Sequence, residues 1–500
     1  MEIDGFFYIK KALLISQQGA LTNFPWLSFT IYSQNGFGPH FIFPYLLIPL
    51  IKIFGLIGGP KLLISLLNGA IFSLFYVLLT KLKITKPLIW TLLFFLGSFY
   101  FLWRINFIRP INISVIIFLL LCYSLINHKY VILSLAAFFY SWFYDGFLLF
   151  LFPLLIFLTV KTVLEKKIPL KFILIYFFSS LLGLIINPFF PKNISYFFTS
   201  YLNIVNNLFN KQLISSVELL PPLLTDLFQQ NIIMVLVIIF SAMILFLIKL
   251  NGRTNNFTNR EKITGYFLGL NALTFTILTL KLVHFIDYLA PSAFLAAGYF
   301  FTLFSRSPKT AELQLFINQL RHQLNRPFLK TLTIIGLLGL AWLPLKSLYL
   351  EFQQAAGLNR YQLTAEWLKK QTPAQSIIFH SAWDAFPRLF FLNDHNYYLV
   401  GLYPTYLYAF DQTRYWLWRN ITEKSAACPA PINLTASNCK DDRQTPQAVA
   451  VTIKNQFQSE YIWVNDYPLY HGFKKFLETN PEYFQKMIET DDSSVFKIIK

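Results

Sequence analysis

Cysteine and charge are both scarce in this sequence. It has three cysteines in 500 residues and no Cys-x-x-Cys pair, so a cysteine-based metal site is not indicated. Charged residues make up 13% of the chain and hydrophobic residues 55%, a composition that excludes an ordinary soluble globular protein. Residues 351–500 are more polar, yet they contain neither a glycine-rich phosphate loop nor the nucleophile elbow of hydrolases.

Acidic residues are also few, with 24 Asp and Glu against 42 Lys and Arg, and the net charge is +18. An excess of this kind can indicate nucleic-acid binding, but the basic residues lie in short segments between apolar runs. No basic face with interleaved aromatic residues occurs in the polar part. The pattern is instead typical of a polytopic membrane protein, so membrane lipids are expected as partners and nucleic acid is not.

Apolar runs close to membrane-spanning length recur between residues 61 and 349. The long run from 130 to 160 is divided at Asp145-Gly146, where a charge and a helix breaker coincide. We therefore expect a mainly α-helical membrane bundle of about ten transmembrane helices. The expected spans are 61–80, 87–103, 111–126, 130–144, 147–160, 172–189, 231–249, 264–280, 288–304 and 331–348.

Lysines and arginines are concentrated in one alternate set of the loops that join these spans. The set comprises the loops at 81–86, 129, 161–171, 249–262 and 306–330. The positive-inside rule makes these loops cytoplasmic. It follows that residues 350–500 form an extracytoplasmic domain of a multi-pass protein of the plasma (inner) membrane. That compartment permits a disulfide bond between Cys428 and Cys439.

Residues 1–60 are expected to form a first outer loop with interfacial helices. The segment from Phe41 to Ile57 is apolar but contains Pro44, Pro49 and Lys52, so a helix on the membrane surface is favoured over a span. No apolar helix precedes Asp4 to carry this loop outward. The sequence therefore predicts that the chain lacks a first transmembrane helix, with a true span at 41–57 as the alternative.

Residues 350–500 alternate between helical and strand-like patterns. Helices are expected at 361–370, 447–457 and 472–479, and strands at 376–380, 397–400 and 461–464. Segments 484–489 and 495–499 are expected to form a hairpin across the turn between them. The three parts of the chain are thus a first outer loop (1–60), a membrane bundle (61–349) and a three-layer α/β domain with an antiparallel edge (350–500).

Two short motifs near the N-terminus carry a resemblance to a known family. Asp4–Tyr8 (DGFFY) stands at the start of the outer loop, and Gly38–Phe41 (GPHF) leads into the apolar surface segment. With many helices and a C-terminal domain following, this organisation resembles the GT-C superfamily of integral-membrane glycosyltransferases. Oligosaccharyltransferase catalytic subunits and protein mannosyltransferases are members. The resemblance implies a polyprenyl-phosphate-sugar donor.

Two further segments resemble parts of the family that hold the donor. Trp103–Pro110 reads WRINFIRP, and Lys281–Pro291 reads KLVHFIDYLAP, close to the family pattern of two basic residues before an aromatic-Ile-acid-Tyr run. The resemblance implies that the donor phosphate is bound by Lys281, His284, Arg104 and Arg109. Oligosaccharyltransferase-like members carry an acidic pair in the loop equivalent to 103–110 to hold a divalent metal. This loop has no acid, so the resemblance favours metal-independent members and no cofactor is expected.

The polar domain carries a third similarity. Trp367–Pro373 (WLKKQTP) is followed by Trp383-Asp384, which resembles an acceptor-recognition element of oligosaccharyltransferases. The following Ala385–Pro387 differs from the Tyr-Gly found there, so the acceptor need not be a peptide. Trp383, Asp384 and, in the first loop, His40 are the candidates for acceptor or loop contacts.

Sugar transfer from a lipid phosphate needs a base for the acceptor and cations for the departing phosphate. Asp4, partly desolvated by its aromatic neighbours, is the expected base. Simpler roles also exist: Asp4 as a solvated terminal residue, His40 as a helix start, and Trp383-Asp384 as a strand-end turn. Arg104 and Arg109 also suit interfacial anchors, and the segment 281–287 suits a structural ion pair.

The sequence therefore predicts a glycosyltransferase that moves a sugar from a polyprenyl-phosphate carrier to an extracytoplasmic glycan, lipid or protein acceptor. A polytopic transporter or lipid-handling protein is one alternative, and a non-catalytic GT-C-like scaffold is another. The sequence shows no internal repeat and no broken helix pair in corresponding halves, which argues against a transporter. The lack of loop acids keeps the scaffold open.

Overall fold

The structure is a computed structural model. It describes residues 3–35, 40–199, 213, 220–250, 257–306, 327–354, 357–431 and 441–500. The chain divides into two compact units. Unit 1 combines residues 1–60, 185–216 and 356–500, and unit 2 combines 61–184 and 217–355.

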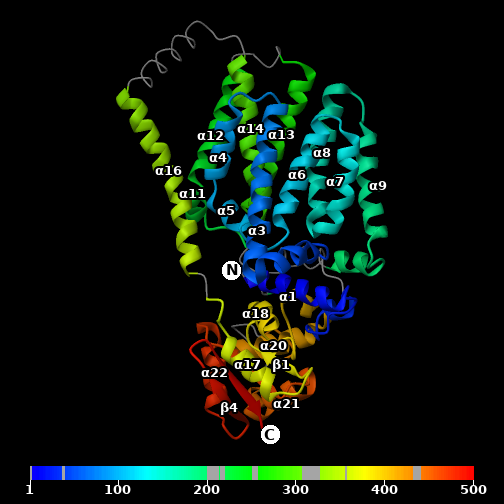
Figure 1. The fold of residues 1–500 in the computed structure, drawn as a ribbon, viewed down its shortest axis with the longest axis vertical. Coiled ribbons are helices and arrows are strands. Elements are labelled where there is room, and N and C mark those ends of the chain that lie inside the picture. The colour runs from blue at the N-terminus through cyan, green and yellow to red at the C-terminus, as the bar shows by residue number, and fades with distance from the viewer. Residues whose placement is uncertain are drawn as a thin grey trace. The chain divides into compact units, whose positions relative to one another are not determined.

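Unit 2 is a helical bundle, and Figure 1 shows most of its helices running alongside one another. Its core is α14 (Ile286–Arg306), which is buried along nearly its whole length and packs against α12 (Ile232–Leu250) and α13 (Asn259–Thr279). A buried hydrogen bond of 3.0 Å from Asn271 to Ser292 joins α13 to α14. The remaining elements are α4 (Pro87–Leu96), α5 (Phe99–Ile105), α6 (Ile111–Ile126), α7 (Tyr130–Phe143), η1 (Asp145–Phe150), α8 (Leu151–Glu165), α9 (Leu170–Ile186), α11 (Leu224–Gln230), η4 (Val283–Phe285) and α16 (Pro327–Gln354).

Each of the ten expected spans overlaps a helix. Four helical segments of the described chain are long and apolar enough to cross a membrane, namely Phe43–Lys81, Gly146–Glu165, Ile232–Leu250 and Val283–Arg306. A fifth is added if the bent pair α4 and α5 counts as one span. The mainly helical fold with several candidate membrane spans is therefore established, while ten crossings stay a prediction.

The expected helix at 87–103 is two helices, because α4 and α5 meet at an angle of 81°. Ser98 caps α5 by accepting a hydrogen bond from the Phe101 amide, and its hydroxyl donates to Asn231 at 2.7 Å. At Gly97, directly after α4, a side chain would clash with the ring of Phe294 on α14. Glycine therefore allows the bend to lie close against α14. The bend is thus stabilised by a hydrogen bond to Asn231, which is more than a hundred residues further along the chain.

Helix α3 (Phe43–Lys81) runs through the boundary between the two units. Its backbone leaves the helical conformation at Gly55, where φ is 77° and ψ is 174°. Glycine tolerates this conformation because it has no Cβ. The break lies inside the apolar segment 41–57, which we expected to be a surface helix, and separates its residues 43–54 from the helix that follows. Its placement at a membrane surface stays a prediction.

Unit 1 contains a five-stranded sheet with the order β2-β1-β3-β5-β4. Its strands are β1 (Ile377–His380), β2 (Tyr397–Tyr398), β3 (Tyr461–Asn465), β4 (Phe484–Glu489) and β5 (Ser493–Ile498). β1 pairs in parallel with β2 and β3, whereas β5 is antiparallel to β3 and β4. The predicted strands and the antiparallel hairpin at one edge are confirmed.

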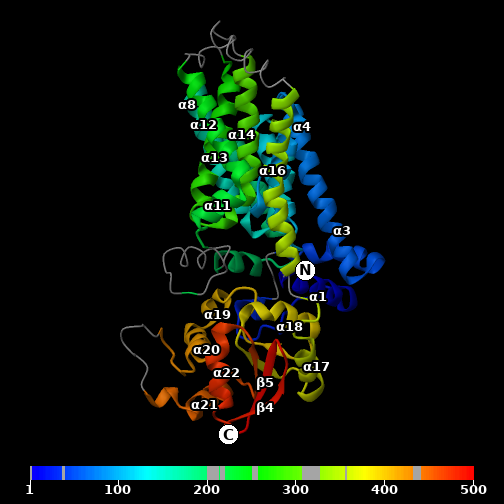
Figure 2. The ribbon, with the colours of Figure 1, turned by 90° about the vertical axis from the view of Figure 1, so that its left-hand side faces the viewer.

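Helices pack against this sheet, and Figure 2 shows α17 and α22 beside β4 and β5. The helices of this part are α17 (Gln362–Gln371), η5 (Trp383–Ala385), α18 (Phe386–Leu392), α19 (Thr405–Phe410), α20 (Gln412–Lys424), η6 (Asp441–Gln444), α21 (Pro446–Phe457), η7 (Pro468–Tyr470) and α22 (His471–Glu478). The predicted helices at 361–370, 447–457 and 472–479 are confirmed. Cys428 is disulfide-bonded, and Cys439 lies outside the described residues.

The N-terminal segment adds to this domain, which the sequence did not predict. The backbone of Tyr398 in the edge strand β2 bonds to Trp26 and Ser28 at 2.9 and 3.0 Å. Helix α1 (Ile3–Gln18) packs on α18, where the ring of Phe6 meets that of Phe391 at 5.2 Å. The segments expected as a first loop (1–60) and as a C-terminal domain (350–500) therefore share one hydrophobic core.

Candidate functional site

The two segments that were expected to bind phosphate meet inside unit 2. Arg104, in the last turn of α5, faces Asp287, in the first turn of α14. The guanidinium Nε and Nη2 atoms donate to the two carboxylate oxygens at 2.7 and 2.8 Å. The side chains are 1% and 0% exposed, so the pair is excluded from solvent. This bidentate geometry is the strongest form of an arginine–carboxylate contact.

His284 joins the pair from the short helix η4. Its Nδ1 atom lies 2.8 Å from Nη2 of Arg104, and its Nε2 atom lies 3.0 Å from the hydroxyl of Tyr144. Tyr144 follows the last residue of α7 with an extended backbone and is buried. Four ionisable or phenolic side chains from α5, η4, α14 and the residue after α7 thus form one hydrogen-bonded group, which we call the arginine cluster (Arg104, Tyr144, His284 and Asp287).

A second group of hydroxyls lies beside the arginine cluster. Ser114 bonds to Tyr140 at 2.8 Å and to Tyr288 at 2.7 Å, and the two tyrosine hydroxyls are 3.1 Å apart. The rings of Tyr140 and Tyr144 stack with centroids 6.5 Å apart. These contacts hold the Tyr144 ring in place from α6, α7 and α14.

The other two phosphate candidates of unit 2 lie outside the arginine cluster. Lys281 is exposed in the turn that follows α13. The guanidinium of Arg109 lies over the ring of Phe107, 4.6 Å from its centroid, which is cation–π geometry. The structure therefore brings Arg104 and His284 together.

Asp4 and His40 lie in unit 1. Asp4 is half-buried in the first turn of α1, where the positive end of the helix dipole favours a carboxylate. His40 is fixed by a 2.7 Å hydrogen bond between its Nδ1 atom and the hydroxyl of Tyr8. Asp4 and Tyr8 are four residues apart and so share one face of α1.

Lys11 lies on the same face of α1 and was missed at the sequence level. It is 4% exposed, and its ammonium lies 3.3 Å from the hydroxyl of Tyr32 and 5.8 Å from the ring centroid of Phe7. Burial lowers the pKa of Lys11 to about 8. The signal in the sequence was the helical spacing of Asp4, Tyr8 and Lys11, but the apparent solvation of a lysine near a chain end hid it.

Trp383 and Asp384 form the start of η5, directly after β1, and both are half-buried. Burial raises the pKa of the Asp384 carboxyl above its ordinary value. Burial raises the pKa of the nearby Tyr361 hydroxyl to about 12, and its oxygen accepts a 3.0 Å hydrogen bond from Nδ2 of Asn465 at the end of β3. The carboxyl ends of two neighbouring parallel strands thus carry polar groups, as ligand sites of α/β sheets often do.

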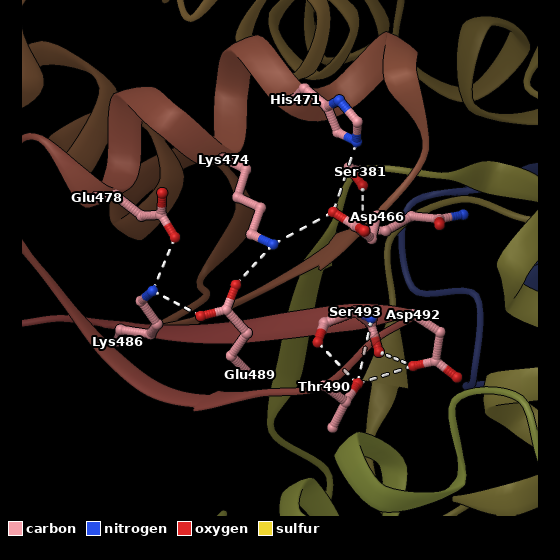
Figure 3. Close-up of polar contacts among 11 residues, drawn as sticks. Ser381, Asp466, His471, Lys474, Glu478, Lys486, Glu489, Thr490, Asp492 and Ser493 are labelled. Carbon is pink, nitrogen blue, oxygen red and sulfur yellow. Dashed lines mark hydrogen bonds and ion pairs between the residues drawn. The ribbon is translucent and has the colours of Figure 1, made fainter.

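An exposed ion network joins α22 to the hairpin, as Figure 3 shows. Lys474 bonds to Asp466 at 3.2 Å and to Glu489 at 2.7 Å. Lys486 bonds to Glu478 and Glu489, each at 2.8 Å. We call this the surface network (Asp466, Lys474, Glu478, Lys486 and Glu489). Its two lysines lower the pKa of Glu489 to about 2.

Within the described ranges, no group of three or more His, Cys, Asp or Glu side chains is arranged to hold a metal ion. No protein-family model matches the chain, and the curated proteins contain no significant match to it. The arginine cluster and the candidate residues of unit 1 are therefore the features that indicate the chemistry of the site.

Proposed function

We propose that this protein is a membrane glycosyltransferase that moves a sugar from a polyprenyl-phosphate carrier to an acceptor outside the cytoplasm. The observation that carries the proposal is the arginine cluster. The resemblance to the GT-C superfamily independently implies that the loop at 103–110 and the turn at 281–291 bind the donor phosphate. A buried ion pair joins Arg104 of the loop to Asp287 of the turn.

The free-energy cost of burying two charges supports a functional interpretation of the arginine cluster. Taking a guanidinium and a carboxylate out of water is expensive, and well-packed apolar residues would stabilise a bundle as well or better. Ionisable side chains inside apolar helical bundles are for this reason rare and mostly functional. An anionic lipid headgroup with an apolar tail is the ligand class that suits a polar cluster surrounded by such helices.

Each residue has a proposed role. Arg104 and His284 hold the donor phosphate site in shape, and Lys281 and Arg109 attract the phosphate electrostatically. Asp4 is the base that removes the proton of the acceptor hydroxyl. Trp383 and Asp384 contact the acceptor, with the half-buried indole offering a face for a sugar ring and the carboxyl accepting from its hydroxyls. The disulfide-bonded Cys428 supports an extracytoplasmic position of this domain.

Reconstituted full-length protein tests the proposal. Radiolabelled polyprenyl-phosphate sugars are supplied in liposomes, and transfer to added acceptors is compared between wild type and Asp4→Asn. We expect transfer by the wild type and a loss of at least about a hundredfold in the variant, because general bases contribute about 10²–10⁴-fold. Asp394→Asn is the matched control, since Asp394 is another half-buried carboxylate of the same unit, in an ion pair with Lys10 at 3.0 Å, and has no proposed catalytic role.

The outcomes separate the alternatives. Transfer that Asp4→Asn leaves unchanged contradicts the assignment of the base. Binding of polyprenyl phosphate without transfer of any sugar favours a scaffold, and movement of the lipid between leaflets without transfer favours a lipid-handling protein.

A further inference from the structure

Two loops of unit 2, one between α6 and α7 and the other between α8 and α9, are in contact. The ammonium of Lys161 on α8 donates to Nε2 of His128 at 3.1 Å. The ammonium of Lys171 on α9 lies over the ring of Tyr130, the first residue of α7, 4.1 Å from its centroid. The ring of Phe172 lies 5.2 Å from the rings of both His128 and Tyr130. The two loops therefore form one surface.

The start of α13 joins this surface. Arg260 donates a 2.9 Å hydrogen bond to the side chain of Asn127, the residue that follows α6. Segments 127–130, 161–171 and 258–262 thus lie together at one end of the bundle, which Figure 1 shows as the shared end of α6, α8 and α13.

These three segments carry a large excess of positive charge, with seven lysines and arginines and two glutamates. Both glutamates have partners in the same segments. Glu165 pairs with Lys161 at 3.6 Å, and Glu261 accepts from the backbone amide and hydroxyl of Thr258. Five of the cations are exposed, and we call them the basic surface (Lys129, Lys166, Lys167, Lys171 and Arg260).

Exposed apolar side chains begin directly beside the basic surface. Helices α7 and α9 pack on each other, with the hydroxyls of Ser134 and Ser179 2.8 Å apart. Each helix has exposed apolar residues every four positions, namely Val131, Leu135 and Phe139 on α7 and Leu170, Leu174 and Phe178 on α9. Residues four apart share one face of a helix. Two apolar stripes therefore start within two residues of Lys129 and Lys171.

A phospholipid has its groups in the same order, an anionic phosphate followed by apolar tails. A nucleic acid or an acidic protein could contact the cations but would leave the apolar stripes uncovered. The positive-inside rule places these loops on the cytoplasmic side, where the membrane leaflet is anionic. The charge and the apolar stripes together favour a lipid of that leaflet as the occupant.

We propose that the basic surface binds the phosphate headgroup of an anionic phospholipid, whose acyl tails lie along the exposed apolar residues of α7 and α9. This inference goes beyond the proposed function and does not depend on it. The positive-inside rule concerns the number of cations in each loop, whereas here cations of three segments act together on a headgroup.

Lipid titration of the full-length protein in a neutral detergent tests this proposal, with native mass spectrometry measuring the Kd. The probes are phosphatidylglycerol, phosphatidylcholine with the same tails, and glycerophosphoglycerol, which is the first headgroup without tails. Each cation near an anionic lipid surface contributes roughly fivefold to affinity. We therefore expect the wild type to prefer phosphatidylglycerol over phosphatidylcholine by about a hundredfold. The variant Lys129→Gln/Lys167→Gln/Lys171→Gln is expected to lose most of that preference.

A matched variant controls for the loss of three charges. Lys81→Gln/Lys83→Gln/Lys86→Gln removes three exposed lysines of the loop between α3 and α4, and Figure 1 shows α4 and α9 on opposite sides of the bundle. We expect this control to bind phosphatidylglycerol as the wild type does. Lys129→Arg/Lys167→Arg/Lys171→Arg keeps the charges and is expected to keep the preference. Detergent has no sides, so the orientation of the chain in a membrane does not affect the comparison.

Three results would overturn the proposal. Equal affinity of the wild type for phosphatidylglycerol and phosphatidylcholine contradicts an anionic-lipid site. An equal loss in the two glutamine variants shows that the total charge matters and the basic surface does not. Glycerophosphoglycerol that binds as tightly as phosphatidylglycerol shows a site for a soluble phosphate ester, with no contribution from the apolar stripes.

Discussion

The arginine cluster of unit 2 and the surface network of unit 1 use the same kinds of charged group in opposite surroundings. Arg104 and Asp287 are 1% and 0% exposed, whereas Lys486 and Glu489 are 39% and 43% exposed. The contact distances are alike, at 2.7 and 2.8 Å. Distance alone therefore says little about what an ion pair contributes to a protein. The energy depends on what each charge would face if its partner were removed, which is a low-dielectric interior in one case and water in the other.

The largest expected effect is in the buried pair. Asp287→Asn removes the carboxylate charge that faces the Arg104 guanidinium, and we expect the free energy of unfolding to fall by about 3–5 kcal/mol. Chemical denaturation of the full chain in detergent measures this. The double variant Arg104→Met/Asp287→Leu is the control, because replacing both charges by apolar groups should recover most of the loss. An Asp287→Asn protein as stable as the wild type would show that the pair is solvated.

Lys11 provides a third case, a buried charge that lies beside aromatic rings and a hydroxyl instead of a carboxylate. Its pKa falls from 10.5 in the unfolded chain to about 8 in the folded one, which corresponds to about 3 kcal/mol. Between those values the unfolded state binds more protons, so folding becomes more favourable as pH rises from about 8 to 10.5. Below pH 8 the full cost is present.

Lys11→Met should therefore remove this rise of stability with pH. Hydrogen exchange of the α1 amides, corrected for the intrinsic effect of pH, measures it locally. Lys10→Met is the control, because Lys10 precedes Lys11 in the same helix but is half-buried and forms an ion pair with Asp394. A wild type whose α1 protection is flat between pH 8 and 10.5 contradicts the burial of a charged Lys11.

The surface network should give the smallest effect. Glu489→Gln removes the charge of an exposed carboxylate that forms two ion pairs. We expect the free energy of unfolding to fall by no more than about 1 kcal/mol, and high salt should abolish this loss. The two lysines lower the pKa of Glu489 from 4.5 to about 2, so its contribution is present above pH 4.5 and is lost as pH falls through 2. Denaturation curves at pH 7 and pH 3, at low and high salt, measure the difference. If Glu489→Gln lowered the free energy of unfolding more than Asp287→Asn does, the surface network would contribute more to stability than the buried pair, contrary to this expectation.

The sequence predicted the elements of this fold well because their signals are local. Helix α6 has the expected bounds of 111–126, and the hairpin of β4 and β5 follows from two alternating segments around a turn. The bend between α4 and α5 was not predictable in this way, because the buried acceptor for Ser98 is Asn231, which lies between α11 and α12. Local periodicity carries no information on such a partner.

The same limit applies to the candidate site. Arg104, His284 and Asp287 were noticed because charges stand out within apolar segments. Tyr144 was not noticed, because one tyrosine among 27 tyrosines and 55 phenylalanines has no distinctive local pattern. The burial of Lys11 was likewise hidden, since it depends on Tyr32 and on the packing of α1. Which residues meet was decided by contacts between distant segments.

The pairing of Trp26–Ser28 with Tyr398 has a consequence for biosynthesis. The side chain of Trp26 bonds to the backbone of Asp394, 368 residues further along the chain. At about 5–20 residues per second, a ribosome needs roughly 20 to 70 s to make the intervening residues. During that time the aromatic face of α1, with Phe6 and Phe7, has no core to enter. The N-terminus of this protein is therefore made first and completed last, and a nascent chain must shield it until its own C-terminal part arrives.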